Sequence, residues 1–428
     1  MIRTIRMSSR IWEKTWLLLA VGSVAGLQVN GQIIVTWANL HPASAWYSYA
    51  NAAGETQQAG QYYYNGTTYH AALWSGTVGS MVDLHPAAAA TSWVDAAAAG
   101  QQVGYASIAG KSRAAFWAGT AASFVDLTPS WASSAEALGV GSAQQVGWCD
   151  PTNPSSGVHA VLWSGSAGSC VDLHPAAWKS SQAYATTGSI QVGGVTKYGS
   201  GNEYAGLWAG TAASFVELGP EWWNSTSVVW TRAVAAGGTN QAGFYQLYNE
   251  FITKAAMWSG SSQSFVSLHP SGATTSSALA TTDTLQAGTA TINGQVCLGV
   301  WRGTAQSFVN LGPINSGLGA GLTNLEVRGI GIQGNTLYLA GDVSSQAVAV
   351  KVVLLPPSLH LAGIQSQGGA QTVTLAWTNN GVSSVLESGD TPNSGWKTAG
   401  GVRITNANSY AAIVTNTTSI QFFRLRAN

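Results

Sequence analysis

One five-residue phrase recurs seven times along the chain, and this repetition limits the fold more than any other feature. VDLHP stands at residues 82–86 and 171–175, with near copies at 38–42, 125–129, 216–220, 266–270 and 309–313. Successive closing prolines are 43 to 50 residues apart. A period near 45 residues fits four short strands and their turns, which is the size of a β-propeller blade.

Two further landmarks follow the same period. A tryptophan stands 12 residues before the proline in six units, at Trp74, Trp117, Trp163, Trp208, Trp258 and Trp301. A Gln-x-Gly begins at Gln58, Gln102, Gln145, Gln191, Gln241 and Gln286. Each unit therefore predicts four strands, named a to d. In the unit at residues 92–127 these strands are SWVDAAAA, QQVGYAS, RAAFWAG and SFVDL. The proline ends strand d, because it has no N–H to donate, and begins the crossover to the next blade.

The two ends of the array are complementary. The first unit begins at strand d with IIVTW, and the last ends on a c-like strand, AVAVKVV. Pairing of residues 33–40 with residues 346–354 would remove both exposed edges. The fold predicted for residues 32–355 is therefore all-β, a seven-bladed β-propeller closed by its N- and C-terminal strands.

The repeat units also resemble a known family. His70-Ala71-Ala72-Leu73-Trp74 and the equivalent run from His159 to Trp163, followed by VDL-x-P and GQxVG, resemble the extracellular repeats named for a His-Ala-Phe triplet. The resemblance covers residues 32–355, although the Gly-Gly that usually follows the Asp-Leu pair is missing. It implies a secreted, propeller-like repeat protein of bacterial type. It implies no reaction, because that family shares no catalytic residues.

The N-terminal segment has the layout of a secretory signal peptide. Basic residues at positions 3 to 14 precede an apolar run from Trp16 to Ala25, which is too short to span a bilayer. We assign residues 1–31 to the signal, with cleavage after either Ala25 or Gly31. The mature protein is then expected outside the cell or at the cell surface, without a membrane span.

The C-terminal segment predicts a separate module. Residues 356–360 form a proline-containing linker, and residues 361–428 carry the strand pattern of a small antiparallel β-sandwich. The sequence W…VLESGD…GW…QFFRLR resembles a short fibronectin-like tail of bacterial secreted and surface proteins. That resemblance implies attachment, sorting or spacing.

Composition excludes some classes of function. Charged residues are 8% of the chain, the formal net charge is zero, and no basic block points to nucleic acid. Cys149, Cys170 and Cys297 have no metal-ligand spacing and are expected to be packed thiols, with a Cys149–Cys170 bridge as the alternative. We expect no cofactor and no metal site.

Aromatic residues gather on one predicted face. The b–c and d–a connections vary in length and lie at the same end of an up-and-down blade, so this face is the expected binding surface. Its aromatic rings would stack on sugar C–H groups while amides take hydroxyls. The alternative is that these rings only cap the blade rims. The candidate ligand-binding residues are Tyr62, Tyr63, Tyr64, Tyr69, Tyr198, Tyr204, Trp222, Trp223, Tyr245 and Tyr248.

Residues that recur once per blade are interpreted as structural. This applies to the phrase histidines, to the strand-d acids and to the Gln-x-Gly glutamines: His41, His85, His174 and His269; Asp83, Asp126, Asp172 and Glu217; and the six glutamines above. Asp95 differs, because it stands alone among alanines on a strand a. Propeller enzymes place acids around the central channel, so Asp95 is the candidate acid for an enzyme.

The sequence favours a secreted or surface-exposed binding or scaffold protein, with glycans or a cell-surface polymer as the preferred ligand. One alternative is a propeller-type extracellular hydrolase or lyase with an unidentified site, and another is a purely structural surface protein. We expect a monomer and favour a binding role over catalysis.

Overall fold

In the computed structural model, description extends to residues 24–30, 33–153, 157–199, 201–219, 228–247, 250–319 and 322–354. After residue 354 the description covers only the backbone of the strands. The side chains of residues 24–30, 228 and 229 are also left out. The chain divides into two compact units, one of which is Ala25–Leu354 and the other of which contains the C-terminal strands.

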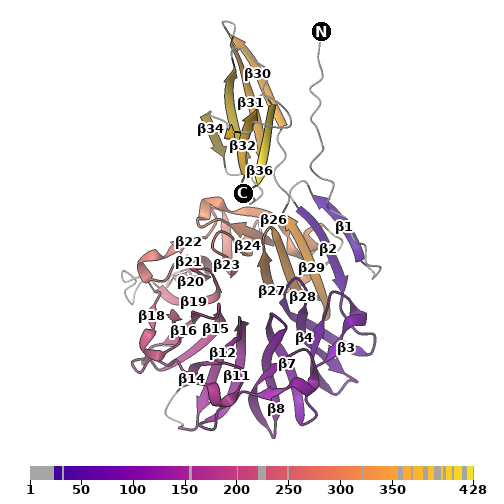
Figure 1. Cartoon of the computed structure of the whole chain (residues 1–428), viewed down its shortest axis with the longest axis vertical. Helices are drawn as coiled ribbons and strands as arrows, with labels where there is room; N and C mark the ends of the chain where they lie inside the picture. The colour runs from indigo at the N-terminus through magenta and orange to yellow at the C-terminus, as the bar shows by residue number, and fades with distance from the viewer. Residues whose placement is uncertain are drawn as a thin grey trace. The chain divides into compact units, whose positions relative to one another are not determined.

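The first unit is a seven-bladed β-propeller (Figure 1). Blades 1 to 6 each consist of four consecutive antiparallel strands, named a to d in chain order. Blade 1 is β3 (Ala45–Ala53), β4 (Gln58–Tyr64), β5 (Thr68–Trp74) and β6 (Val82–Asp83). Blade 2 is β7 (Ala89–Ala98), β8 (Gln101–Ile108), β9 (Lys111–Trp117) and β10 (Val125–Asp126). Blade 3 is β11 (Ala132–Gly141), β12 (Gln144–Pro151), β13 (His159–Trp163) and β14 (Val171–Asp172).

The next three blades follow the same order. Blade 4 is β15 (Ser180–Thr186), β16 (Gln191–Thr196), β17 (Glu203–Trp208) and β18 (Val216–Glu217). Blade 5 is β19 (Val228–Gly237), β20 (Asn240–Leu247), β21 (Thr253–Trp258) and β22 (Val266–Ser267). Blade 6 is β23 (Ala273–Thr281), β24 (Gln286–Ile292), β25 (Gln295–Trp301) and β26 (Val309–Pro313). Strand d is two residues long in five of these blades, which is shorter than the sequence predicts.

Blade 7 closes the ring as predicted. It contains β27 (Leu325–Gln333), β28 (Thr336–Val343) and β29 (Gln346–Leu354), and the N-terminal β2 (Ile33–Asn39) supplies its strand d. The register pairs Ile33 with Leu354 and Asn39 with Val348. A further strand, β1 (Val24–Asn30), lies outside β2. Signal cleavage after Gly31 would remove β1, whereas cleavage after Ala25 would leave most of it.

A short 3₁₀ helix joins strands c and d in blades 1 to 6. These helices are η1 (Val78–Ser80), η2 (Ala121–Ser123), η3 (Ala167–Ser169), η4 (Ala212–Ser214), η5 (Ser262–Ser264) and η6 (Ala305–Ser307), and a seventh, η7 (Ile314–Gly319), follows blade 6. In blade 2, Ser123 Oγ accepts from the Ala118 N–H at 2.8 Å and donates to the Thr120 carbonyl at 2.6 Å. This local bonding explains the constant spacing between tryptophan and proline.

The recurring Trp and Gln-x-Gly residues build the blade cores. The six strand-c tryptophans are fully buried, and the glutamines are buried rather than half-buried. Gln102 Oε1 accepts from the Gly119 N–H at 2.9 Å, and equivalent bonds occur in all of blades 1 to 6. The motif's glycine is required, because a Cβ on Gly104 would lie 2.1 Å from the Trp93 carbonyl oxygen. The expected bonding of these glutamines to nearby backbone is confirmed.

The C-terminal strands form two antiparallel sheets. One contains β30 (His360–Gln367), β31 (Ala370–Thr378), β35 (Ser409–Asn416) and β34 (Val402–Asn406), and the other β33 (Lys397–Thr398), β32 (Ser384–Gly389) and β36 (Phe422–Ala427). Packing of these sheets as a sandwich stays a prediction, as does the signal segment, whose residues 1–23 lie outside the described residues.

Candidate functional site

The recurring histidines join neighbouring blades. His85 Nδ1 lies 2.8 Å from Ser92 Oγ, which accepts from the Ala71 N–H of the preceding blade at 3.0 Å. His85 Nε2 lies 3.0 Å from the Ala89 carbonyl oxygen, so Nε2 carries the proton and Nδ1 accepts from the serine. The same histidine–serine contact occurs at His41–Ser48, His174–Ser181 and His269–Ser276.

Two blades make this link without histidine. Thr128 Oγ1 accepts directly from the Ala114 N–H at 3.1 Å, and Thr231 Oγ1 from the Ala205 N–H at 2.8 Å. The constant element is thus a hydroxyl that satisfies a buried N–H of the preceding blade. The structural interpretation of the phrase histidines is confirmed by these contacts.

The strand-d acids cap the crossover, with one exception. Asp83 Oδ1 accepts from the His85 N–H at 2.8 Å, and Asp126 and Asp172 make the equivalent bond two residues on. An aspartate side chain that bonds the backbone two residues on stabilises a turn. Glu217, the fourth of these acids, forms an ion pair instead, with its carboxylate 3.5 Å from Lys197 Nζ.

Two of the predicted ligand-binding tyrosines are buried, which corrects their assignment. Tyr62 is 3% exposed and donates to Asp83 Oδ2 at 2.9 Å. Tyr245 is 8% exposed, and its hydroxyl lies 3.0 Å from Ser267 Oγ. Both rings point into blade cores, where strand b alternates between its two buried sides, so neither contributes to a binding surface.

The other predicted residues separate into four groups. Tyr64 and Tyr198 are exposed, and Tyr64 stacks on His70 with ring centres 4.5 Å apart. Tyr204 lies under Lys197, whose Nζ is 4.3 Å from the ring centre. Trp222, Trp223 and Tyr248 lie outside the described residues.

The remaining two, Tyr63 and Tyr69, belong to a continuous group of rings on blade 1. Trp46 and Tyr47 lie 6.2 Å and 6.0 Å from Tyr63, which lies 5.0 Å from Tyr69, and Tyr69 lies 6.3 Å from Tyr49. Trp46 is 67% exposed and Tyr47 44% exposed. We name these five residues the aromatic platform. It lies where β3 begins and where β4 turns into β5, on the face that the sequence indicates.

The a strands form the inner wall of the ring, since each contacts the a strands of both neighbouring blades. Every a strand has a β-bulge at the same place. The bulged residues are Asn51, Asp95, Leu138, Tyr184, Val234, Leu279 and Arg328. The residues two positions earlier are Tyr49, Trp93, Glu136, Gln182, Arg232, Ser277 and Glu326. The backbone repeats here while the side chains do not.

One pair on this wall consists of two acids. Asp95 of blade 2 interacts with Glu136 of blade 3, and Asp95 Oδ2 is buried without a hydrogen-bond partner. Burial first, and then the charge of Glu136, raise the pKa of Asp95 well above its usual range. Burial also raises the pKa of Glu136, although hydrogen bonds from Trp148 and Trp93 oppose that shift. The pair therefore retains a proton at pH values where ordinary carboxyls are ionised.

Two arginines occupy other places on the wall. Arg232 Nε donates to Glu203 Oε1 at 2.9 Å, and its guanidinium lies 4.9 Å from the ring centre of Tyr184. Arg328 Nε donates to Asp342 Oδ1 at 2.6 Å, and its guanidinium lies 4.7 Å from the ring centre of Tyr49. The wall thus places bulged residues of one blade against residues of the next. Through its contact with Tyr49, Arg328 also connects the inner wall with the aromatic platform.

Sequence reasoning identified Asp95 but missed Glu136, Trp46, Tyr47 and Tyr49. A usable signal exists, because aligning the seven a strands shows where the copies differ. AWYSYA carries three rings where the equivalent ATTSSA of blade 6 carries none, and ASSAEAL carries an acid. These residues lie on the a strands, whereas the sequence indicated the b–c and d–a connections as the binding surface.

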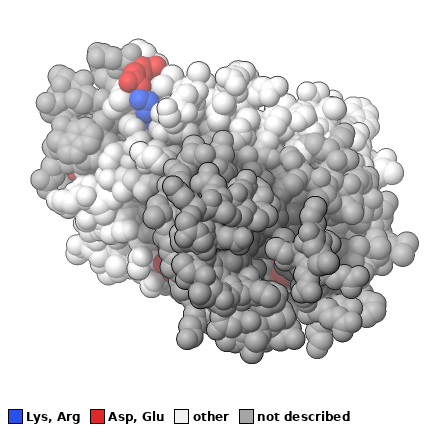
Figure 2. Space-filling model, turned by 90° about the horizontal axis from the view of Figure 1, so that it is seen from above, with Lys and Arg blue, Asp and Glu red and all other residues white. Residues whose placement is uncertain are grey.

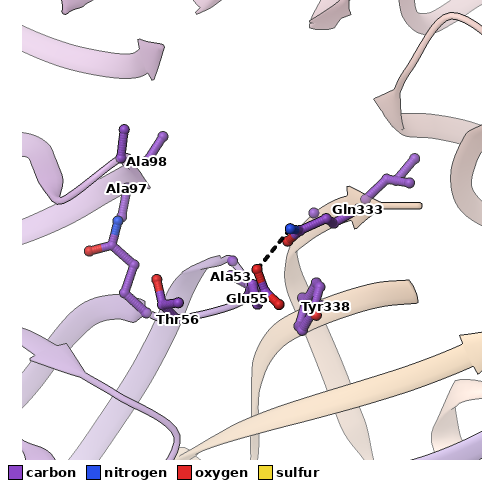
Figure 3. Close-up of a pocket in the computed structure, with 12 residues that line it drawn as sticks. Ala53, Glu55, Thr56, Ala97, Ala98, Gln333 and Tyr338 are labelled. Atoms are coloured by element: carbon purple, nitrogen blue, oxygen red, sulfur yellow. Dashed lines mark hydrogen bonds between the residues drawn. The ribbon is translucent and has the colours of Figure 1, made fainter. Parts of the chain in front are cut away.

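The described residues also form a hollow on the opposite face, among the a–b turns of blades 7, 1 and 2 (Figure 3). Its volume is about 330 Å³. Polar side chains come from Glu55, Thr56, Gln57, Gln333 and Tyr338, and Ala97 to Ala99 form the wall on the blade 2 side.

Within the part of the chain that is described, no group of three His, Cys, Asp or Glu residues has an arrangement that would hold a metal ion. Cys149 and Cys297 are buried thiols, and Cys170 is partly buried. No described helix has the length and apolar character needed to cross a membrane.

Comparison with known proteins yields the fold and no family. No protein-family model matches the chain, and no curated protein matches its sequence. A prolyl endopeptidase structure is 8% identical with a TM-score of 0.45, covering 78% of this chain and 55% of that one. The β-propeller domain of the trilobed protease from Pyrococcus furiosus is 8% identical with a TM-score of 0.46, covering 72% of this chain and 94% of that domain.

An acylaminoacyl peptidase from Pyrococcus horikoshii is 9% identical with a TM-score of 0.43, covering 78% of this chain and 58% of that one. The chain thus spans little more than half the length of the two whole peptidases. These likenesses concern the propeller fold alone.

Proposed function

We propose that this protein is a secreted or surface-exposed binding protein that holds carbohydrate on its aromatic platform. The observation that carries the proposal is the continuous row of rings with Trp46 and Tyr47 at its exposed end. A group of exposed aromatic rings leaves apolar surface in contact with water, and such a group marks a binding surface. A flat ring face complements the C–H face of a pyranose.

The charge distribution favours a neutral ligand. Much of the described surface visible in Figure 2 belongs to uncharged residues, and the chain has a formal net charge of zero. Stacking and hydroxyl–amide bonds do not depend on ligand charge, whereas a nucleic acid would need a basic surface. A neutral glycan or cell-surface polymer is therefore the proposed partner, bound by a monomer. The signal-like N-terminal segment supports an extracellular location.

A glycan array with the mature protein, followed by titration of the best ligand, tests this proposal. Each good ring contact contributes about 0.5–1.5 kcal/mol, so Trp46→Ala and Tyr63→Ala should each weaken binding roughly three- to tenfold. Phe251→Ala is the matched control, since Phe251 is an exposed ring outside the platform and 76% exposed. Equal binding by wild type and the Trp46 variant, or no glycan bound at all, would contradict the proposal.

The acid pair supports a second candidate function, a propeller-type hydrolase or lyase. A carboxyl that keeps its proton above the usual range is the form a general acid needs, and the Asp95–Glu136 pair on the inner wall has both pKa values raised. In this reading burial and the charge of Glu136 hold the proton on Asp95, and Glu136 relays it to the leaving group.

Turnover assays on any glycan that binds test this second candidate. Glu136→Gln keeps the shape of the side chain but has no proton to donate, so activity should fall at least about 100-fold while binding is retained. Absence of turnover in the wild type, or full activity in Glu136→Gln, would leave binding as the function.

A further inference from the structure

The hollow on the face opposite the platform results from unequal turn lengths. The a–b turn of blade 1 has four residues, Gly54 to Gln57, whereas the flanking turns of blades 2 and 7 are the two-residue Ala99–Gly100 and Gly334–Asn335. The a strands of blades 2 and 7 therefore extend further than that of blade 1. The space left above blade 1 is the hollow shown in Figure 3.

Blades 4 and 6 also have four-residue a–b turns, but neighbouring groups fill the space beside them. In blade 4, a Cβ on Gly188 would lie 2.7 Å from Ser142 Cβ of blade 3. In blade 6, Asp283 Oδ1 accepts from the Thr239 N–H of blade 5 at 2.8 Å. Beside blade 1, a Cβ on Gly100 or on Gly334 would meet nothing within 4 Å. The space beside blade 1 thus stays open near Gly100 and Gly334, although Glu55 bonds Gln333 of the preceding blade.

Glu55 gives this space its chemistry. Its Oε2 accepts from Gln333 Nε2 at 2.7 Å (dashed in Figure 3), and none of the ion pairs among described residues includes it. No Lys or Arg lines the hollow, and Lys351 Nζ lies 5.8 Å from the centre of the Tyr338 ring. Burial first, and then the charge of Glu55, raise the pKa of Tyr338. The hollow therefore combines a solvent-exposed carboxylate that has no ion pair among the described residues with hydroxyl and amide groups.

We propose that this hollow binds a small ligand that carries a protonated primary amine. The ammonium lies against Glu55, and the Thr56 and Tyr338 hydroxyls with the Gln57 amide take the hydroxyls of the ligand where it has them. The alanine wall of Ala97 to Ala99 leaves room for a sugar ring or a short alkyl chain. An amino sugar and an aliphatic amine share the required ammonium. This site is separate from the platform and does not depend on the function proposed for it.

Calorimetric titration of the full-length mature protein with glucosamine, glucose and n-butylamine tests the proposal. Glucosamine should bind at least tenfold more tightly than glucose. Glu55→Gln should weaken glucosamine binding at least tenfold, because the amide cannot balance the ammonium charge. Asp283→Asn removes the acid at the same turn position of blade 6 and should leave the affinity unchanged. If n-butylamine binds as tightly as glucosamine, the ligand class is aliphatic amines. If it binds more weakly, the ligand class is amino sugars.

A second variant tests the location. Ala98→Leu fills the hollow from β7 without touching Glu55, and it should abolish binding of both amines while the melting temperature stays close to that of wild type. Equal affinities for glucosamine and glucose, undiminished binding by Glu55→Gln or Ala98→Leu, or no binding of either amine to the wild type would each overturn the proposal.

Discussion

The outer strands of the blades and the inner wall follow different rules. In the outer strands the same Trp, Gln and Gly recur and make the same contacts in blade after blade. On the inner wall the β-bulge recurs, but it carries an asparagine, an acid, a tyrosine or an arginine in four blades and an aliphatic residue in the other three. Only 8% of the residues in the chain are charged, so the presence of several charged residues on the inner wall is notable. Positions that agree hold the ring together, and positions that differ are where the proposed sites lie.

Removing the strand that closes the ring tests this comparison first, and it should have the largest effect on stability. Deleting Ile33–Asn39 removes strand d of blade 7 and exposes the edge of β29. An exposed edge pairs with other chains, so the variant should aggregate or lose its cooperative melting transition. Size-exclusion chromatography and a melting curve measure this. A monomeric variant with the melting temperature of wild type would show that closure is dispensable.

A recurring glutamine should matter more than one on the inner wall. Gln102→Ala removes a fully buried side chain and leaves the partly buried Gly119 N–H without its acceptor, which should cost about 1–3 kcal/mol of unfolding free energy. Gln333→Ala, at an exposed position on β27, should change it by less than about 0.5 kcal/mol. Urea unfolding of both variants makes the comparison, and equal losses would remove the distinction between the two regions.

The acid pair should make the inner wall less stable as pH rises. The pKa of Asp95 is raised in the folded protein, so its stabilising contribution is present at low pH and is lost as pH increases above the unfolded value near 4. Asp95→Asn is neutral at every pH. Relative to wild type it should therefore gain stability from pH 5 to pH 8, as measured by urea midpoints. A constant difference across that range would mean that the pair carries no extra proton.

The histidine links should show the opposite and smaller dependence. Burial lowers the pKa of His41, His85, His174 and His269, so their contribution is present above about pH 6.5 and is lost as pH falls below it. The double variant His85→Thr/Ser92→Ala copies the histidine-free link made by Thr128. It should lose less stability than wild type between pH 7 and pH 5. An identical loss in both proteins would exclude His85 as a source of the acid sensitivity.

The sequence was sufficient for the features that repeat and insufficient for those that do not. Seven proline phrases and unmatched end strands predicted the blade number and the pairing of β2 with β29, because edge pairing follows from the strand count. The burial of Tyr62 and Tyr245 was missed because the side of strand b that a residue faces depends on packing between blades. The meeting of Asp95 with Glu136 was missed because it joins residues 41 positions apart through the ring geometry. The hollow depends on differences between neighbouring turns that no single unit displays.

Two tryptophans test the central claim most directly, because they are the same residue in the two kinds of position. Trp117 recurs, is fully buried and packs against the Phe124 ring, whereas Trp46 is non-recurring and 67% exposed. Unfolding free energy and glycan affinity should be measured for Trp117→Ala and Trp46→Ala together. We predict a loss of about 3–5 kcal/mol of stability for Trp117→Ala. For Trp46→Ala we predict weaker glycan binding with a stability change below about 0.5 kcal/mol. A Trp46 variant as unstable as the Trp117 variant, with its glycan affinity unchanged, would contradict the account.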